Sequence, residues 1–541
     1  MSRRALLGAA AATAMLPRRA RARGGAPEAF GAVGDGQSDD TAALRRWLDA
    51  DLGEHRLTGG RTYLVRPSRV GDVILPVRRR GLRLLGDGAL IRVAERTPGF
   101  GAILGSLAPA EDLSGLDVRG IQFDHAAPAT LPFAVRDGVL TEGRHTVAVR
   151  RGADIAFTGN TVSRAATTNA VYVNGDGFTS RVIVAHNRFE RVGRTPNRVY
   201  HDHSTLYLTG DGLRAENNVF IADGWGNEGS VCAIEVHPGR GCTVKGNTIT
   251  GFHTGINYAA VYETDSIGGV VEGNTLDVLR RGIAIYSIKY LMHVAGWGVD
   301  GLRIDANRIR LRNATPQGRM SGGGPGCFGI ATVGGATLPV RDLVIGGGNR
   351  IIFDNDAQGQ AWDGISYGVG IGETTTDALF DQVHIGDLEI TDAPVMGIAL
   401  GQSGGTLGRC TVGRPTIVRP ASTKSMRLVS DYRSAMWISP RRLAGSVRVE
   451  GARVIDETGG SRLHSLVFVS APVADAAAVI DVALDARLGG RAPQLAHPVV
   501  VLPGRAPRVR LTTDLAVLPR PFGSLAPGSA SFFEGRTEPL R

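Results

Sequence analysis

The chain has 541 residues, of which 43% are hydrophobic and only 6% aromatic, and it contains 75 glycines and 26 prolines. This composition supplies many turns and predicts a thin aliphatic core, unlike the compact core of a generic globular enzyme. The net charge of +10 is carried almost entirely by arginine, and no basic run with interleaved aromatic residues predicts a nucleic-acid partner. No internal apolar segment is long enough to predict a membrane-spanning helix.

The N-terminus has the pattern of an export signal. Arg3 and Arg4 precede an alanine-rich stretch that runs to Leu16, and a small-x-small site follows at Ala20 and Ala22. We therefore predict that residues 1–22 are a twin-arginine signal peptide and that the mature protein is periplasmic or secreted. A disordered basic tail is the alternative. Removal of the segment lowers the net charge to about +5, which allows a mild attraction for polyanions such as acidic polysaccharides.

Residues 23–75 are predicted to form an N-terminal cap. The segment from Phe30 to Thr41 reads FGAVGDGQSDDT, an amphipathic stretch continues to Leu48, and GRTYLV follows at 60–65. This opening resembles that of the pectate-lyase-like superfamily, whose members close a right-handed parallel β-helix with such a segment and a short helix. The resemblance implies this all-β fold but does not name a reaction, since the superfamily includes polysaccharide lyases, glycoside hydrolases, epimerases and phage tailspikes. Three acidic residues of the segment are interpreted as loop and helix N-cap residues: Asp35, Asp39 and Asp40.

A repeat of asparagines follows, each with an apolar residue two positions later. The asparagines are Asn160, Asn187, Asn218, Asn247, Asn274, Asn307 and Asn349. The steps between them are 27, 31, 29, 27, 33 and 42 residues, a period that is typical of solenoids. The flanking runs, such as RVIVAHNRF and GGVVEGNTL, are rich in β-branched residues and lack a helical period.

This pattern predicts that residues 76–425 are coils of a parallel β-helix. We expect the asparagines to stack at one turn and to bond to one another through their side-chain amides. The alternative is a series of turns in which each asparagine bonds only its own backbone. Beyond Asn349 the repeat loosens while β runs continue, so residues 426–541 are predicted to form further coils and a C-terminal cap. A separate small β domain is the alternative for this last part.

Alternation along the strands predicts which side chains face outward. In five aligned runs the second residue should point into the core, namely Val171, Leu206, Ile234, Ile256 and Ile283. One outward column then contains Tyr172, Tyr207, Glu235, Asn257 and Ala284. A second outward column contains Asn174, Thr209, His237, Ala259 and Tyr286. Such columns resemble a sugar-binding groove, where aromatic faces contact sugar rings and amides bond hydroxyl groups. A ladder that only stabilises the sheet is the alternative.

Polar loops precede these strands and add further candidates. They contain His201, Asp202 and His203, then Trp225, Asn227 and Glu228, and then His253. Clustered histidines are expected where protons are transferred, although His186, which directly precedes a turn asparagine, is interpreted as structural. No metal or other cofactor is predicted, because the four cysteines lack ligand spacing and two loop histidines are weak evidence for a metal. A disulfide between Cys232 and Cys242 and buried free thiols are both left open.

The sequence favours a polysaccharide lyase that cleaves a uronic-acid-containing glycan by β-elimination. A base removes the proton α to the carboxylate, a cation or amide stabilises the enolate, and an acid assists the leaving oxygen. His237 or His203 is the candidate base and Tyr207 the candidate acid. The candidates that meet the substrate carboxylate are Asn257, Asn227 and Arg240. The strand-borne acids of calcium-dependent pectate lyases are not matched, since Glu235 is the only carboxylate in the two columns.

Two other classes of function stay open at this stage. A glycoside hydrolase needs two carboxylates that flank the bond, for which Glu235 with Asp202 or Glu228 is the best choice. A non-catalytic glycan-binding or scaffold protein needs only columns that bond to one another. The expected partner is a polysaccharide or oligosaccharide, and the oligomeric state, monomer or trimer, is left open. The candidate catalytic residues are His237, Glu235, Tyr207, His203 and Asp202. The candidate substrate-binding residues are Tyr172, Asn174, Trp225, Asn227, Glu228, Arg240, His253, Asn257 and Tyr286.

Overall fold

The computed structural model describes most of the chain between residues 25 and 524. The described residues are 25–95, 97, 99–126, 135–136, 139–140, 145–165, 169–175, 179–192, 203–222, 231–260, 265–287, 298–312, 327–333, 338–354, 366–372, 378–401, 405–422, 433–456, 463–471, 473–488, 499–501, 508–513 and 522–524. The proposed signal peptide, residues 1–22, lies outside them and stays a prediction.

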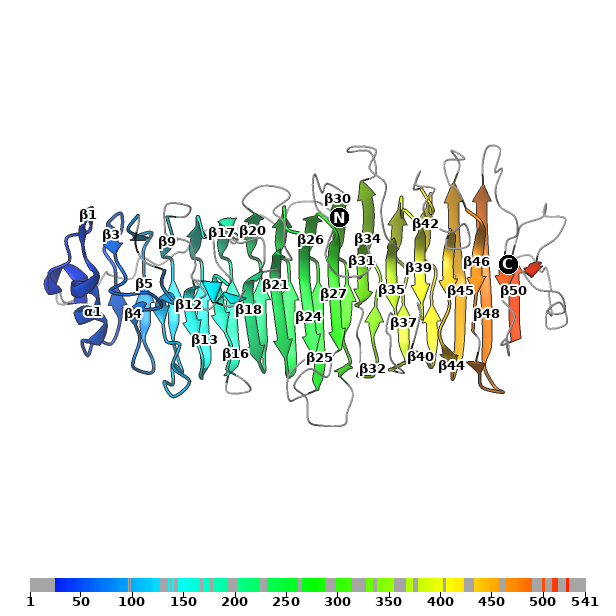
Figure 1. Ribbon diagram of the computed structural model, residues 1–541, viewed down its shortest axis with the longest axis horizontal. Coiled ribbons are helices and arrows are strands. Elements are labelled where there is room, and N and C mark those ends of the chain that lie inside the picture. The colour runs from blue at the N-terminus through cyan, green and yellow to red at the C-terminus, as the bar shows by residue number, and fades with distance from the viewer. Residues whose placement is uncertain are drawn as a thin grey trace, which may run out of the picture.

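The chain forms the predicted right-handed parallel β-helix. Its strands pair in parallel into a 34-stranded sheet and a 15-stranded sheet, while β10 (Val135–Arg136) and β11 (Val139–Leu140) form a separate antiparallel pair. Figure 1 shows the coils stacked one after another along the long axis of the molecule. Most coils contribute one strand to the 15-stranded sheet and two to the large sheet, so the large sheet supplies two of the three walls.

The 15-stranded sheet forms the wall on which the candidate site lies. Its strands are β4 (Val73–Pro76), β7 (Ala102–Gly105), β12 (His145–Val149), β15 (Val171–Val173), β18 (His203–Gly210), β21 (Val231–Pro238), β24 (Thr254–Ala260), β27 (Arg281–Ser287), β31 (Cys327–Thr332), β35 (Ser366–Ile371), β39 (Met396–Leu400), β43 (Ser434–Ile438), β46 (Ser465–Val469), β49 (Val499–Val501) and β51 (Phe522–Ser524). Each strand pairs with the next in this order, so the strands after residue 426 continue the same sheet. We call the outer face of this sheet the outer wall.

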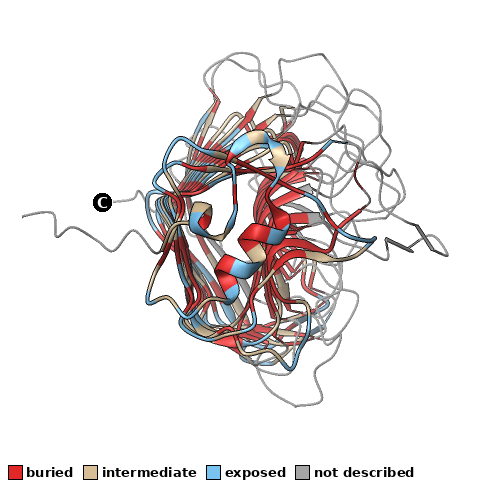
Figure 2. Cartoon of the chain, turned by 90° about the vertical axis from the view of Figure 1, so that its left-hand side faces the viewer, coloured by how far each residue is buried: buried red, intermediate tan, exposed pale blue. Residues whose placement is uncertain are grey.

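A short helix covers the N-terminal end of the coils. The 3-10 turn η2 (Pro27–Phe30) precedes the helix α1 (Thr41–Asp49), which buries Leu44 and Trp47. Figure 2, which looks along the molecule from this end, shows α1 lying across the coils with buried residues along part of its length. The apolar side of the helix therefore covers the first coil, which would otherwise expose its interior.

Asp40 joins this helix to the segment before it. Asp40 occupies the N-cap position, as the sequence indicated, but its carboxylate does not bond a helix N–H. It accepts hydrogen bonds from the backbone N–H groups of Val33 and Gly34, at 2.6 and 3.1 Å. The acidic residue thus holds the FGAVG segment against the start of the helix.

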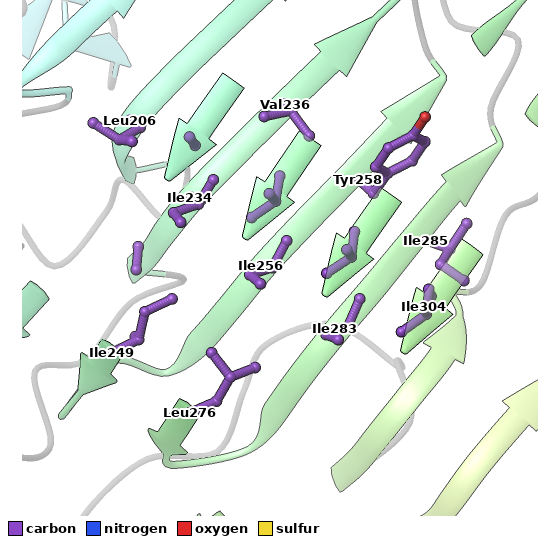
Figure 3. Packing of buried hydrophobic residues seen from close by; sticks show 14 of the residues in the cluster. Leu206, Ile234, Val236, Ile249, Ile256, Tyr258, Leu276, Ile283, Ile285 and Ile304 are labelled. Atoms are coloured by element: carbon purple, nitrogen blue, oxygen red, sulfur yellow. The ribbon is translucent and has the colours of Figure 1, made fainter. Parts of the chain in front are cut away.

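The core is one continuous aliphatic column. Figure 3 shows Leu206, Ile234, Ile256 and Ile283 on successive strands, all pointing into the coil interior, and all four are fully buried. The strand register pairs each of them with the next. Because one coil contributes only a thin layer of such side chains, burial depends on the neighbouring coils, as is general in solenoids.

The seven asparagines form a buried ladder at the turn between the two strands of each coil in the large sheet. Around its centre, the backbone N–H and the Nδ2 of Asn218 both donate to Oδ1 of Asn247, each at 3.0 Å. Nδ2 of Asn247 in turn donates to the carbonyl of Ala215 and to Oδ1 of Asn274, at 2.8 and 2.9 Å. The same pattern runs from Asn160 to Asn349, which confirms the predicted stacking.

The residue before each ladder asparagine adopts a left-handed backbone conformation. These residues are Gly159, His186, Asn217, Gly246, Gly273, Ala306 and Gly348. Glycine adopts this conformation at little cost, whereas other residues are strained there. His186, with φ at 57°, is exposed at such a turn, in agreement with its interpretation as a structural residue.

Arginines on the outer faces of the large sheet are bound to acidic residues. Arg181 binds Asp154 at 2.6 Å, and Arg350 binds Glu389 at 2.8 Å. Such exposed pairs each contribute little to stability, but they neutralise much of the arginine charge where it arises.

The structure also bears on the pairing of the cysteines and on membrane-spanning segments. All four cysteines are buried free thiols. Cys232 lies in β21 and Cys242 in β22 (Arg240–Lys245), which belong to different sheets. Within the described part of the chain, no helix combines the length and apolarity needed to cross a membrane.

Candidate functional site

The strand register assembles the first predicted column on the outer wall. Tyr172 of β15 pairs with Tyr207 of β18, Tyr207 pairs with Glu235 of β21, and Glu235 pairs with Asn257 of β24. All four residues are partly exposed, whereas their neighbours along each strand are buried. The column therefore faces outward, as the alternation predicted.

The second column is also in register. Thr209 pairs with His237, and Ala259 pairs with Tyr286 on the next two strands of the wall. Asn174 follows β15, and its Nδ2 donates a hydrogen bond to the hydroxyl of Tyr172 at 2.9 Å. The two columns are thus bonded to each other at this end.

A carboxylate and an imidazole form the centre of the wall. His237 Nε2 lies 2.8 Å from Glu235 Oε1, and the Ser204 hydroxyl donates to Glu235 Oε2. The side chains of His237 and Glu235 are only 6% and 12% exposed. Burial raises the pKa of Glu235, but His237, Ser204 and Asn257 together lower it below its usual value.

This arrangement sets the roles of the two groups. Glu235 is ionised at neutral pH, so it only accepts hydrogen bonds, and Nε2 of His237 is the donor. In a neutral imidazole the lone pair then belongs to Nδ1, which is buried in the structure, so it must become uncovered before it can take a proton from a substrate. A carboxylate that orients a histidine in this way is a common device in general-base catalysis.

Four rings stack along the same part of the wall. The ring centroids of His145 and Tyr172 are 4.5 Å apart, those of Tyr172 and Tyr207 are 5.7 Å apart, and those of Tyr207 and His237 are 4.9 Å apart. The rings of His145, Tyr172 and Tyr207 face one another and the His237 ring is tilted by 38° to that of Tyr207, so the ring faces are largely covered by other rings. The sequence had suggested that ring faces would meet the sugar, and this geometry favours contact through edges and hydroxyl groups instead.

Arg281 and Tyr286 lie at the other side of Asn257. Nη1 of Arg281 donates to the Tyr286 hydroxyl at 3.4 Å, and its guanidinium carbon lies 5.7 Å from the centre of the Phe328 ring. Burial raises the pKa of Tyr286, an effect that Arg281 opposes and Glu235 strengthens. Tyr286 therefore lies within electrostatic reach of both charged residues.

Two candidates from the sequence do not lie in the outward columns of the wall. His253 is buried at the corner before β24, where its Nδ1 lies 3.1 Å from the Thr254 hydroxyl. Burial, with the nearby charges of Arg281 and Arg280, lowers the pKa of His253 to about 3, so it is neutral at physiological pH. Arg240 begins β22 in the large sheet and is exposed, and none of its described contacts reaches the wall.

Several other candidates lie outside the described residues. These are Asp202, Trp225, Asn227 and Glu228, together with His201. His203 begins β18 and its backbone pairs with Val231, but its side chain is not among those described. Their proposed roles, including the paired carboxylates of a hydrolase, stay predictions.

The C-terminal part of the same wall is apolar. Beyond β27 the outward side chains form a second hydrophobic cluster, which contains Ala284, Phe328, Ala331, Val333, Tyr367, Val395, Met396, Ala399, Trp437 and Phe468. The rings of Trp437 and Phe468 stack with centroids 4.0 Å apart. Among the described strands of this wall, the charged residues are Glu235 and Arg281, with histidines at 145, 203 and 237, so the charged residues and the histidines all lie between β12 and β27.

Sequence reasoning missed three members of the wall. Ser204 and Arg281 each lie one position before an aligned run, and His145 belongs to a coil that precedes the aligned set. The repeat alone gave no signal for His145. Ser204, Cys232, Thr254 and Arg281 are paired in register one position before the aligned runs, and the side chains of Ser204 and Arg281 contact Glu235 and Tyr286 of the outward columns.

The described residues offer little for a metal. No group of three or more histidine, cysteine or acidic side chains suited to an ion occurs among them. The cysteines are poor candidates as ligands or nucleophiles, because burial raises the pKa of the Cys410 thiol to about 12 and also that of Cys242 and Cys327.

Comparisons with known proteins bear on the fold. No family model and no curated protein sequence matches the chain. The tailspike protein of Escherichia coli bacteriophage HK620, solved in complex with a pentasaccharide, is similar in structure, with a TM-score of 0.57 and 15% sequence identity. The match covers 92% of this chain and 78% of the tailspike. A substituted variant of that tailspike, also with pentasaccharide, gives a TM-score of 0.56 at 15% identity and covers 90% and 75% of the two chains.

At this identity the likeness establishes the architecture and not the chemistry. The superfamily resemblance read from the N-terminal segment stays a prediction beyond that architecture. The chain has the right-handed parallel β-helix fold that is also found in phage tailspikes.

Proposed function

We propose that this protein is exported and acts on a polysaccharide, cleaving a uronic-acid-containing glycan by β-elimination on the outer wall. The observation that carries this proposal is the contact of His237 Nε2 with Glu235 Oε1 at 2.8 Å, on a wall that also holds stacked tyrosines. The pentasaccharide bound by the similar tailspike adds support for a glycan ligand.

In the proposed reaction His237 is the general base. It removes the proton on the carbon next to the sugar carboxylate while Glu235 holds the ring and stabilises the imidazolium that forms. Tyr207, whose ring lies 4.9 Å from that of His237, is the proposed acid that protonates the leaving glycosidic oxygen. Elimination leaves a carbon–carbon double bond in one product, and no water enters the bond that breaks.

A single carboxylate favours elimination over hydrolysis. Glu235 is the only acidic residue in the fifteen described strands of this sheet. Hydrolysis requires a second carboxylate at bond-flanking distance, and its candidates Asp202 and Glu228 lie outside the described residues. Hydrolysis is therefore the alternative reaction that the following test can detect.

The test measures two products on the same samples. The purified protein is incubated with acidic and neutral glycans while absorbance of unsaturated ends and release of reducing sugar are followed. We expect unsaturated ends from an acidic glycan, with the rate reduced about a hundredfold or more in His237→Ala. Reducing sugar without unsaturated ends would instead assign hydrolysis.

Matched variants separate the site from the scaffold. His384 lies exposed on the large sheet, so His384→Ala removes an imidazole without touching the outer wall. We expect this variant to keep full activity. Equal rates for His237→Ala, Glu235→Gln and the unmodified protein would reject the proposed catalytic pair.

Export is tested independently of catalysis. We expect the mature chain to begin near residue 23, and replacement of both Arg3 and Arg4 by lysine to retain the precursor inside the cell. Terminal sequencing of the exported protein gives the cleavage point, and the amount of precursor inside the cell measures its retention. An exported protein that keeps residues 1–22 would contradict a cleaved signal.

A further inference from the structure

Arg281 differs from the other arginines that this protein places on its surface. It is the only arginine or lysine in the fifteen strands of the outer-wall sheet. On the large sheet, by contrast, arginines such as Arg181 and Arg350 bind Asp154 and Glu389. Within the described residues Arg281 forms no ion pair, and its side chain donates a hydrogen bond to the neutral hydroxyl of Tyr286.

The surroundings of Arg281 leave polar atoms without partners. Its Nε is buried and forms no hydrogen bond, and the same is true of Oδ1 of Asn257 and Nε2 of His253. A buried polar atom without a partner destabilises the fold, so most such atoms in folded proteins are satisfied by protein or by a bound molecule. Three such atoms on or directly before the adjacent strands β24 and β27 indicate a place where a polar ligand completes the bonding.

The kinds of atom define the ligand. The guanidinium of Arg281 offers a positive charge and N–H donors in a planar arrangement, which suits a carboxylate. Asn257 Oδ1 accepts a hydrogen bond, which suits a hydroxyl group. His253 is neutral and adds no positive charge, so the site favours one negative charge with hydroxyl groups beside it. A sugar that carries a carboxylate has this combination.

The position of the site relates it to the proposed catalytic pair. Glu235 lies on β21, Asn257 on β24 and Arg281 on β27, which are consecutive strands. Adjacent strands are about 4.8 Å apart, so Arg281 lies roughly 10 Å along the wall from the strand that carries Glu235 and His237. That spacing is comparable to one or two sugar units of a glycan chain.

We propose that Arg281 is a specificity residue that binds the carboxylate of an acidic sugar on the outer wall, with Asn257 receiving a hydroxyl group of the same glycan. This inference rests on the proposed function, which already gives the glycan a carboxylate, and adds the residues that bind that carboxylate and a neighbouring hydroxyl group. The stacking of the guanidinium near Phe328 and its contact with Tyr286 hold the side chain in place before the ligand arrives.

The experiment measures equilibrium binding of the full chain by calorimetry. The probes are galacturonate- and glucuronate-containing oligosaccharides and the same oligosaccharides after reduction of their carboxyl groups. We expect at least one acidic probe to bind more tightly than its reduced form, and Arg281→Gln to weaken its binding by about tenfold to a hundredfold. Binding of the reduced probe should change little in the variant.

Two further variants serve as controls. Arg281→Lys keeps the charge but loses the planar donors, so it should recover part of the affinity. Arg350→Gln removes an equal charge from the large sheet and should leave binding unchanged. Thermal unfolding and circular dichroism of each variant check that the fold is intact, since Arg281 also contacts Tyr286 and Phe328.

The outcomes for this inference and for the proposed reaction are distinguishable. If acidic probes bind through Arg281 but no unsaturated ends appear, the acidic-sugar site stands and elimination fails. If a glycan is cleaved and Arg281→Gln binds and cleaves it like the unmodified protein, the reaction stands and this site fails. The site is also overturned if no acidic probe binds more tightly than its reduced counterpart.

Discussion

Two columns of polar side chains run along this β-helix, and they differ in how completely they are bonded. In the asparagine ladder the six amides from Asn160 to Asn307 repeat the same contacts, Asn349 closes the series on two backbone carbonyls, and all seven residues are at most 2% exposed. On the outer wall the residue type changes from strand to strand, and atoms of Asn257 and Arg281 have no partner. A repeated, closed network indicates a structural role, while an irregular and incomplete one indicates a place for a ligand.

The largest expected effect is that of acid, which protonates histidines near the outer wall and no residue of the ladder. The pKa of His145 is lowered to about 4 and that of His253 to about 3, mainly by burial, whereas the ladder contains no group that titrates. Below pH 6.5, the ordinary pKa of histidine, these two residues are protonated in the unfolded chain but stay neutral in the folded chain. The free energy of unfolding therefore falls as the pH drops toward 3. We expect a loss on the order of 5 kcal/mol between pH 7 and pH 4.

Urea unfolding at a series of pH values measures this loss, and His253→Gln identifies its source. The variant should show a shallower dependence on pH, because glutamine carries no proton to gain. A dependence as steep as that of the unmodified protein would show that His253 is not buried as a neutral group.

The next comparison removes one asparagine from each column. Asn247→Ala leaves the N–H and Nδ2 of Asn218, the Ala215 carbonyl and Oδ1 of Asn274 short of a partner inside the protein. We expect it to lower the free energy of unfolding by about 3 kcal/mol or more. Asn257→Ala, on the partly exposed wall, should cost about 1 kcal/mol or less. Equal losses in denaturant unfolding would contradict the division between the two columns.

A smaller effect concerns the backbone that supports the ladder. Ala306 precedes Asn307 with φ at 53°, where four of the seven equivalent residues are glycine. Ala306→Gly should relieve the left-handed strain and raise the free energy of unfolding by roughly 0.5–1 kcal/mol. The melting temperature reports this change, and a lower value in the variant would mean that the turn is not strained.

The smallest effect is expected on the outer faces of the large sheet. Arg350 and Glu389 are both well exposed and lie 2.8 Å apart. Arg350→Gln should change stability by less than about 0.5 kcal/mol, and less still at high salt. If Arg350→Gln lowered the free energy of unfolding by several kcal/mol, these ion pairs would stabilise the fold as much as the ladder does, which would contradict this prediction.

The sequence predicted the features that repeat. The asparagine spacing gave the fold and the ladder, and alternation placed Tyr207, Glu235 and Asn257 on one face, because both arguments need only a regular period. The register then confirmed these neighbours.

The sequence did not predict features that depend on the corners of the coils. Arg281 lies just before an aligned run, so only the pairing with Thr254 places it on the wall. His253 was predicted to be a substrate-binding residue of a polar loop before a strand. Instead its carbonyl accepts the backbone N–H groups of Arg280 and Arg281, each at 3.1 Å, at a buried corner. Such corners vary in length and have no period from which their geometry follows.

The limited extent of the ladder has a mechanical consequence. At the turn position that follows Asn349, Leu388 and then Pro415 replace asparagine, as the backbone bonds from Glu389, Thr416 and Arg453 show. The last coils are therefore held together by backbone pairing and apolar packing without the amide clamp. The coils before Asn160 also lack it, with Ile121 and Ala89 at the equivalent position. Under a pulling force we expect the coils outside the ladder to unfold first, one coil at a time, and resistance to rise where the asparagines begin.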